Sequence, residues 1–254
     1  MPDSGVFISD DVEVSEFTIT VASECYSGLD LVRDALNQQP SFNSAIVWGI
    51  PCTPKPEKLI SDAELVLLMT DRASLQLAID RLSAYRQLNL TTILIYLQDD
   101  EVVSAEKIPG LILPRLQLPA GFSYLTRAVF APIIPQGLVC VDWADTRHVL
   151  VMDGQIVMEE ASGSKREAVI EAVVTRLRKH ASGRSILGLQ VSILCSQNKL
   201  AVRHVHHLLS MCKKTAGEES TFIVAAPFLD WPDSNYYEVR LFARVECAGP
   251  GGIV

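Results

Sequence analysis

The chain has 254 residues and a net charge of −8, and its composition is 48% hydrophobic and 20% charged. This length suffices for one large domain or two small ones, and the composition is that of an ordinary globular protein. The acidic balance argues against non-specific binding to nucleic acids or anionic membranes, which requires basic surfaces. No apolar run approaches the ~20 residues that cross a membrane.

The start of the chain and its cysteines indicate a cytoplasmic protein. Residues 1–15 are polar and acidic, without the basic region and apolar core of a secretion signal, and we expect them to be flexible. The cysteines are scattered and never paired at CxxC spacing, which is typical of reduced, mostly buried thiols. They are Cys25, Cys52, Cys140, Cys195, Cys212 and Cys247.

The N-terminal half alternates apolar strands with helices, which favours an α/β fold with a mostly parallel sheet. The expected strands are Phe17–Ala22, Ala45–Ile50, Glu64–Met69, Thr92–Leu97 and Leu111–Leu113. Amphipathic helices are expected from Ser27 to Gln39, from Leu75 to Tyr85 and from Phe122 to Ala131. Residues 16–121 therefore form a doubly wound unit, and the helix within residues 122–136 connects it to the rest of the chain.

The C-terminal half follows a different order, with strands at Gln155–Glu160, Leu189–Cys195, Thr221–Ala226 and Tyr237–Val245. Helices are expected at Lys165–His180 and Leu200–Cys212. This order predicts a smaller sheet with helices on one face. The turn DWPDSN (230–235) joins the last two strands. Trp231, Tyr236 and Tyr237 beside it indicate either hairpin packing or an interface anchor.

Two aspartates mark the segment between these halves. Residues 137–151 read GLVCVDWADTRHVLV, with Asp142 and Asp145 three residues apart where a helix is expected to begin. Such a pair commonly caps a helix and complements its dipole. The surrounding residues point to a second interpretation, because the segment resembles the catalytic synergy loop of FtsZ, the bacterial relative of tubulin. In that family the loop reaches across a filament contact and acts on GTP held by the neighbouring subunit.

The resemblance rests on named positions. Asp142 and Asp145 match the two acidic residues of the family's loop, Gly137, Leu138, Val141, Ala144 and Arg147 match positions around them, and Trp143 stands for a Phe. Cys140 replaces an Asn that orients the attacking water, and this change favours docking over catalysis. The order of elements from Phe17 onward is also similar to the family. It implies a nucleotide-binding-like domain, a shortened connecting helix and a C-terminal α/β domain (137–254).

The phosphate-binding loops of that family are missing. Backbone amides converge on a phosphate only where glycine leaves room for them. After the first strand the chain has SECYSG, and after Met69 it has TDRASLQ, with no glycine between Gly49 and Gly110. Phe122 and Ser123 stand where the family reads guanine with Asn and Asp. The resemblance therefore implies a protein that lacks conventional GTP binding.

The histidines His204, His206 and His207 share one expected helix. His204 and His207 have the spacing of zinc ligands on one face. No carboxylate or cysteine stands at a supporting position, so the pattern favours a solvated helix face.

These observations predict a cytoplasmic FtsZ-like pseudo-GTPase that acts through protein contacts in cell division or a related cytoskeletal process. It would assemble with itself or cap and modulate FtsZ filaments, without cofactor, metal, nucleic acid or membrane anchor. The expected partner-binding residues are Gly137, Leu138, Cys140, Asp142, Trp143, Asp145 and Arg147, and no residue is expected to be catalytic. Two alternatives stay open: a divergent GTPase that uses Thr70 and Arg72, and a tubulin-fold scaffold for an unrelated partner.

Overall fold

A computed structural model describes residues 17–23, 46–49, 63–98, 108–114, 118–130, 133, 137–195, 200–227 and 236–247. The expected flexible residues 1–15, the expected helix Ser27–Gln39 and the turn 230–235 lie outside these ranges. In the part of the chain that is described, no helix is long and apolar enough to cross a membrane.

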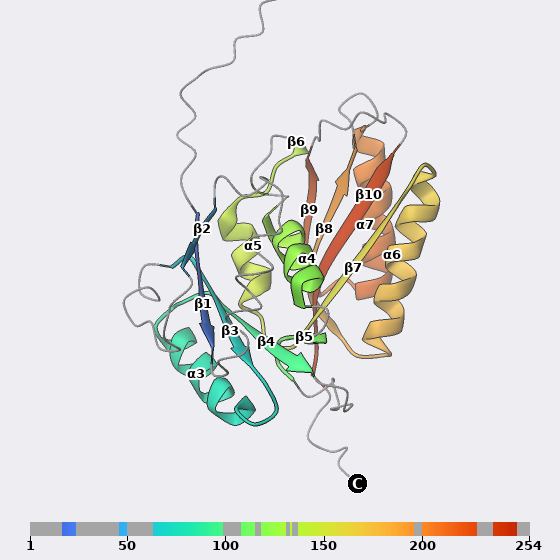
Figure 1. Cartoon of the computed structure of the whole chain (residues 1–254). Helices are drawn as coiled ribbons and strands as arrows, with labels where there is room; N and C mark the ends of the chain where they lie inside the picture. The colour runs from blue at the N-terminus through green and yellow to red at the C-terminus, as the bar shows by residue number, and fades with distance from the viewer. Residues whose placement is uncertain are drawn as a thin grey trace, which may run out of the picture.

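The described strands form one mixed sheet with helices on both faces (Figure 1). Its strands are β1 (Phe17–Ser23), β2 (Ile46–Gly49), β3 (Leu65–Thr70), β4 (Thr92–Gln98), β5 (Leu111–Pro114), β6 (Gly137–Val139), β7 (Gln155–Gly163), β8 (Ile186–Leu194), β9 (Thr221–Pro227) and β10 (Tyr237–Val245). They lie in the order β2-β1-β3-β4-β5-β7-β10-β8-β9-β6. This is the α/β architecture that the sequence predicts.

The N-terminal strands β2, β1, β3, β4 and β5 are all parallel. Helix α3 (Leu75–Gln87) packs Ala78 and Leu82 on one face, against Val66, Leu68 and Leu94. Helices α4 (Leu118–Phe130) and α5 (Trp143–Leu150) cover the other face. Both faces of β3 and β4 are therefore buried, which explains their unbroken apolar runs and confirms the doubly wound prediction.

Helix α4 begins four residues earlier than the sequence suggests. The expected start is Phe122, whereas α4 begins at Leu118 and includes Pro119. Proline is tolerated in the first turn of a helix, where its missing amide has no intrahelical acceptor to lose. The connecting helix therefore overlaps the end of the N-terminal unit.

In the C-terminal half, β10 lies between β7 and β8 and is antiparallel to both, while β8 and β9 are parallel. The last two strands, β9 and β10, are therefore not a hairpin. Helices α6 (Arg166–Ala181) and α7 (Val202–Ala216) pack together on one face. The expectation of helices on one face only is wrong, because α4 and α5 also pack against the opposite face through Phe242, Ile223 and Ala225.

The two halves share one core and one sheet. Strand β5 meets β7 through the pair Leu111 and Ile156, and the apolar cluster around α4 and α5 contains residues from both halves. Neighbouring strands rotate by roughly 20–25° in a twisted sheet. Over the steps from β1 to β9 this rotation turns the strand direction nearly around, so β1 points down and β8 and β9 point up in Figure 1.

Candidate functional site: the loop before α5 and the turn after β3

The predicted loop leaves the sheet edge from a short strand. β6 pairs antiparallel with the end of β9, with Gly137 opposite Pro227 and Val139 opposite Ala226. Gly137, the first residue of the predicted loop, begins this strand. The chain then passes through residues 140–142 into α5. The loop therefore lies where the carboxyl end of β9 meets the start of α5, at the top of Figure 1.

Asp142 is the N-cap of α5. Its Oδ1 accepts a hydrogen bond of 2.8 Å from the backbone amide of Asp145, which lies in the first helical turn. Arg147 and His148 occupy the last turn. Acids near the start and bases near the end both suit the helix dipole. The capping interpretation of the two aspartates is therefore confirmed, and both side chains are exposed to solvent.

Buried residues hold this exposed loop from below. Val141, Thr146, Val149 and Leu150 are buried, and Trp143 packs against the apolar core as a half-buried anchor. The residues on the outside are Leu138, Cys140, Asp142, Ala144 and Asp145. The loop thus has a fixed base and presents two carboxylates, a thiol and two apolar side chains.

Arg147 does not share this exposed surface. Its Nε donates to the Thr91 hydroxyl at 2.8 Å, and its Nη2 donates to the backbone carbonyl and to Oδ1 of Asn89, both at 2.9 Å. Asn89 has a φ of 62°, in the left-handed region that Asn tolerates better than most residues. Arg147 therefore fixes α5 to the turn between α3 and β4. An Asn just after a helix is a common stop signal, and this signal could have pointed to Asn89 in the sequence.

The turn after β3 is the second part of the site, because the FtsZ resemblance expects a phosphate-binding loop there. The Asp71 carboxylate accepts hydrogen bonds from the Ala73 amide at 3.1 Å, from the Ser74 amide at 3.1 Å and from the Ser74 hydroxyl at 2.8 Å. The Thr70 hydroxyl lies 3.0 Å from that of Ser74. A carboxylate of the chain itself thus accepts the amide hydrogen bonds at the start of α3.

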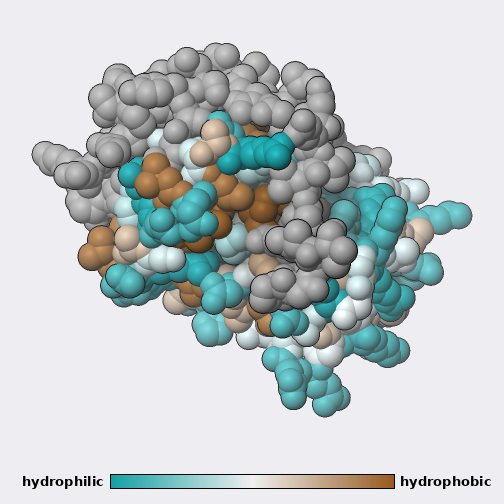
Figure 2. Space-filling model, turned by 90° about the horizontal axis from the view of Figure 1, so that it is seen from below, coloured by the Kyte–Doolittle hydropathy of each residue, from teal (hydrophilic) through white to brown (hydrophobic). Residues whose placement is uncertain are grey.

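These two parts lie at opposite ends of the molecule. The turn follows the carboxyl end of β3 near the bottom of Figure 1, whereas the loop lies at the top. Figure 2 looks at the molecule from below, and hydrophobic residues reach its described surface in a patch beside hydrophilic ones. The twist of the continuous sheet produces this separation, because β3 and β9 belong to opposite ends of the strand order.

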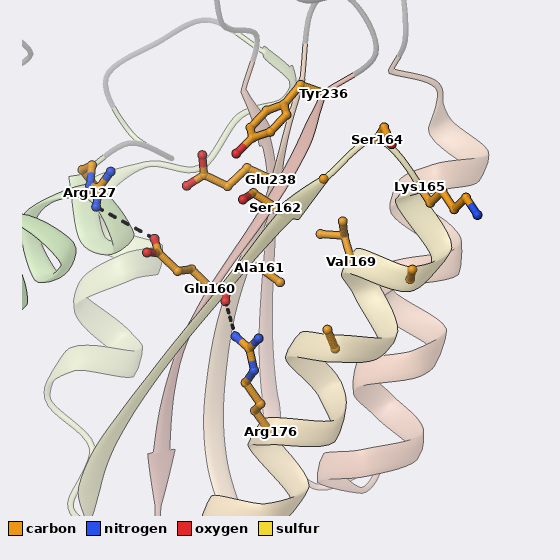
Figure 3. Close-up of a pocket in the computed structure, with 13 residues that line it drawn as sticks. Arg127, Glu160, Ala161, Ser162, Ser164, Lys165, Val169, Arg176, Tyr236 and Glu238 are labelled. Carbon is orange, nitrogen blue, oxygen red and sulfur yellow. Dashed lines mark hydrogen bonds and ion pairs between the residues drawn. The ribbon is translucent and has the colours of Figure 1, made fainter.

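A hollow of about 680 Å³ lies along β7, between α4 and α6 (Figure 3). The carboxylates of Glu160 and Glu238 point to the side of β7 on which Arg127 lies, and Arg176 lies on the α6 side. Arg127 is 3.9 Å from Glu160, and Arg176 donates to the Glu160 backbone carbonyl. Three cations and two carboxylates line this hollow, so its charges largely offset one another, and no sequence motif pointed to it.

The histidines occupy different environments. His204 is buried, and its Nδ1 accepts a hydrogen bond of 3.3 Å from the Ala201 amide at the start of α7. His206 and His207 are exposed. The prediction of a solvated face is therefore right for the last two and wrong for His204, which caps the helix. Among the described residues, no group of three His, Cys, Asp or Glu could hold a metal ion.

Other predicted residues are placed as follows. Cys195 and Cys212 are buried, Cys247 is half-buried and Cys140 is exposed, whereas Cys25 and Cys52 lie outside the described ranges. Phe122 and Ser123 belong to α4. Tyr236 and Tyr237 are half-buried at the start of β10, and Trp231 lies outside the described ranges. Arg72 is exposed, whereas Thr70 is buried.

Solved structures of FtsZ, CetZ and TubZ have a similar fold. FtsZ of M. jannaschii, solved as an empty dimer, superposes with a TM-score of 0.60 at 10% identity, covering 94% of this chain and 95% of that one. CetZ from Methanosaeta thermophila superposes with a TM-score of 0.60 at 13% identity, covering 93% of this chain and 88% of that one. TubZ of Bacillus thuringiensis serovar israelensis, solved as GDP-form protofilaments, superposes with a TM-score of 0.52 at 8% identity. The match covers 72% of this chain and 62% of that one.

The likeness is one of structure. No protein-family model matches the sequence, and the search of curated proteins gives no match either. The fold is nevertheless shared over nearly the whole chain with FtsZ and CetZ. The chain therefore has an FtsZ/tubulin-like fold, as the sequence resemblance predicts.

Proposed function

We propose that this chain is an FtsZ-like pseudo-GTPase that does not bind GTP in the manner of FtsZ and acts through protein contacts. It assembles with itself or caps and modulates filaments of the FtsZ type. Cell division or a related cytoskeletal process in the cytoplasm is the setting that this role implies.

One observation carries the proposal: the Asp71 carboxylate accepts both backbone amides and the hydroxyl at the turn after β3. A phosphate at that turn would need the same donors, and it would meet a negative charge at close range. The carboxylate therefore takes the place of the anion. These occupied amides support the loss of conventional GTP binding more directly than the missing glycines do.

The loop at the opposite end supports a contact role. Asp142 and Asp145 are exposed on a base held by Trp143 and Val141, so a partner can reach both carboxylates without rearrangement of the core. Cys140 is exposed beside them. FtsZ and TubZ, with which this chain shares its fold, were solved as a dimer and as protofilaments, and this supports self-association as one form of contact.

The first experiment is isothermal titration of the chain with GTP and Mg²⁺, beside an authentic FtsZ as positive control. We expect no binding at micromolar concentrations. Micromolar affinity would contradict the proposal and favour a divergent GTPase. A second titration with Asp71→Ala tests the reason, because removal of the carboxylate exposes the amides of Ala73 and Ser74 and should make any residual affinity for phosphate stronger.

The second experiment measures FtsZ assembly by sedimentation and phosphate release while this chain is titrated in. The test variant is Asp142→Asn, Asp145→Asn, because Asn keeps the helix cap but removes both charges. The matched control is Glu218→Gln, Glu219→Gln, an exposed pair after α7 with the same change in charge. We expect the wild-type chain to change FtsZ sedimentation or phosphate release at less than one chain per FtsZ. The control variant should keep this effect and the test variant should lose it.

Two results would count against a contact through the loop. If neither FtsZ assembly nor the sedimentation of the chain alone changes at equimolar protein, the chain acts on neither FtsZ nor itself. If the test variant behaves like the wild type, the contact uses a different surface, as expected for a tubulin-fold scaffold of an unrelated partner.

A further inference from the structure

The exposed face of α7 is basic in a protein that is otherwise acidic. Helix α7 contains Arg203, Lys213 and Lys214 but no Asp or Glu. Because it carries three of the 22 Lys and Arg and none of the 30 Asp and Glu, the rest of the chain has 19 cations against 30 acids, a net charge of −11. Cationic side chains are thus concentrated on this helix.

These side chains form one stripe. Arg203, His206, His207, Lys213 and Lys214 are all exposed. The last four follow Arg203 by three, four, ten and eleven residues, which places all five on one side of the helix. The opposite side is buried through His204, Val205, Leu208 and Cys212. We call these five exposed residues the α7 basic stripe.

The stripe has no carboxylate partner among the described residues: no ion pair within 4.0 Å joins any of its five members to an acid there. Lys213 lies 6.0 Å from the centre of the Phe222 ring, a contact that leaves its charge exposed. The acids nearest in sequence are Glu218 and Glu219, after the end of α7. On α6, the pKa of Glu167 is lowered first by a hydrogen bond from its own backbone amide and also by Arg166 and His207. The formal positive charges of the stripe therefore lie near the two ends of α7, at Arg203 and at Lys213 and Lys214.

The stripe is also hollowed. His206, Leu209, Ser210, Lys213, Lys214 and Glu218 line a depression of about 680 Å³. Two ammonium groups and the apolar Leu209 thus border a space that can receive side chains from a partner.

We propose that the α7 basic stripe binds a short acidic segment of a partner protein. From Arg203 to Lys214 the stripe is about 16 Å long, since a helix rises 1.5 Å per residue. An extended peptide covers this length with about five residues. Carboxylates at alternate positions of such a peptide would face the cations, and an apolar residue among them would enter the depression beside Leu209.

The dimensions favour an acidic peptide over a nucleic acid. A duplex carries regular charge over a far longer distance, and beyond the stripe it would meet a protein whose remaining net charge is −11. Repulsion there offsets attraction at the stripe. A segment of a few acidic residues is attracted to the stripe and is too short to reach far beyond it. It therefore fits the charge pattern better.

The test is fluorescence anisotropy of a labelled deca-glutamate peptide with the full chain at physiological ionic strength. The variant is Arg203→Glu, Lys214→Glu. The control with the same change in charge is Arg72→Glu, Arg81→Glu, an exposed arginine on the turn before α3 and a half-buried arginine on α3, both away from α7. We expect saturable binding that weakens as salt rises, falls at least tenfold in the variant and changes less than threefold in the control.

A neutral pair, Arg203→Gln and Lys214→Gln, keeps the test valid if the charge-reversed chain does not fold, and it should lose affinity to a smaller degree. No binding of the peptide by the wild type at millimolar concentration would overturn the proposal. So would equal losses in variant and control, which would indicate a general charge effect. Tighter binding of a 20-base-pair DNA that depends on the same two residues would assign the stripe to nucleic acid instead.

Discussion

The guanidinium of Arg244 on β10 donates hydrogen bonds to the backbone carbonyls of Leu150 and Gly154, at and beyond the end of α5. Arg244 is almost fully buried, and burial is the main cause that lowers its pKa to about 9. Its positive charge stands at the carboxyl end of the helix whose other end carries Asp142 and Asp145. The helix that presents the candidate loop is thus fixed to the sheet by a buried cation.

Replacement of Arg244 by Met should destabilise the fold. The variant leaves two buried carbonyls without this donor, at about 1–3 kcal/mol each, while it removes the cost of burying a charge. We expect the cost of the two unpaired carbonyls to exceed the cost of burying the charge. The free energy of unfolding, measured by urea denaturation, should therefore fall by about 2 kcal/mol. Arg244→Lys should lie between Met and wild type. Unchanged or greater stability of the Met variant would mean that charge burial costs as much as the bonds contribute.

Arg147 and Asn89 should be coupled energetically. Arg147→Ala removes three hydrogen bonds, and because the site is partly exposed we expect a loss of about 1–2 kcal/mol. Asn89→Gly keeps the left-handed turn and removes only the side-chain acceptor, so its loss should be smaller. A double-mutant cycle from chemical denaturation should give a coupling of at least about 0.5 kcal/mol. Additive losses would show that the guanidinium acts on Thr91 and the Asn89 backbone alone.

The strands and helices that the sequence predicts are those with a strong local pattern. Strands β3 and β4 are unbroken apolar runs, and α6 repeats apolar residues at helical spacing. The spacing of apolar residues shows which side chains of these elements are buried, and this spacing can be read from one sequence. The position of β10 between β7 and β8 depends instead on pairing between distant segments. Sequence order therefore suggested a neighbour for β9 that the sheet does not have.

Polar residues inside the structure were the harder part to predict. Arg240 and Arg244 alternate with Phe242 along β10, on the side that faces α4 and α5. A composition-based reading places arginines outside, because their burial depends on acceptors from other segments. Asp71 has the same difficulty: the sequence shows only an acidic residue shortly after Met69, and the fold brings it to the amides of Ala73 and Ser74.

Asp71 should contribute to stability through these hydrogen bonds. Asp71→Ala removes the acceptor for two backbone amides at the start of α3, and loss of such a cap costs about 1 kcal/mol. Asp71→Asn keeps an acceptor oxygen and should cost less than half of that. Thermal and urea unfolding of the three chains measure the difference. Equal stability of Asp71→Ala and wild type would mean that solvent satisfies these amides as well as the carboxylate does.

The buried thiol of Cys212 should make stability depend on alkaline pH. Burial raises its pKa to about 12, from an ordinary value of 9.0. Between these values the folded chain keeps a proton that the unfolded chain has lost, so the stability present below pH 9 decreases as the pH rises. Between pH 8.5 and 10 we expect the wild type to lose about 1 kcal/mol more than Cys212→Val, because all other titrating groups are the same in both chains. Both chains are unfolded in urea with a reductant present, and parallel pH profiles would contradict this prediction.

Cys140 offers a direct probe of the proposed contact. It is exposed beside Asp142, whereas burial raises the pKa of the Cys195 thiol to about 11 and that of Cys212 to about 12. The thiolate is the reactive form, so maleimide at neutral pH should label Cys140 roughly 100-fold faster than either buried cysteine. Peptide mapping by mass spectrometry resolves each site, and Cys140→Ser identifies the fast one.

The same reaction can then be followed as the chain assembles or binds FtsZ. A contact through the loop covers Cys140 and should slow its labelling at least tenfold, while Cys247, half-buried at the end of β10, keeps its own rate. The variant Asp142→Asn, Asp145→Asn should restore rapid labelling if the two carboxylates hold the partner. Complexes that form while Cys140 stays fully reactive would place the contact on a different surface and leave the fold, rather than the loop, as the feature shared with FtsZ.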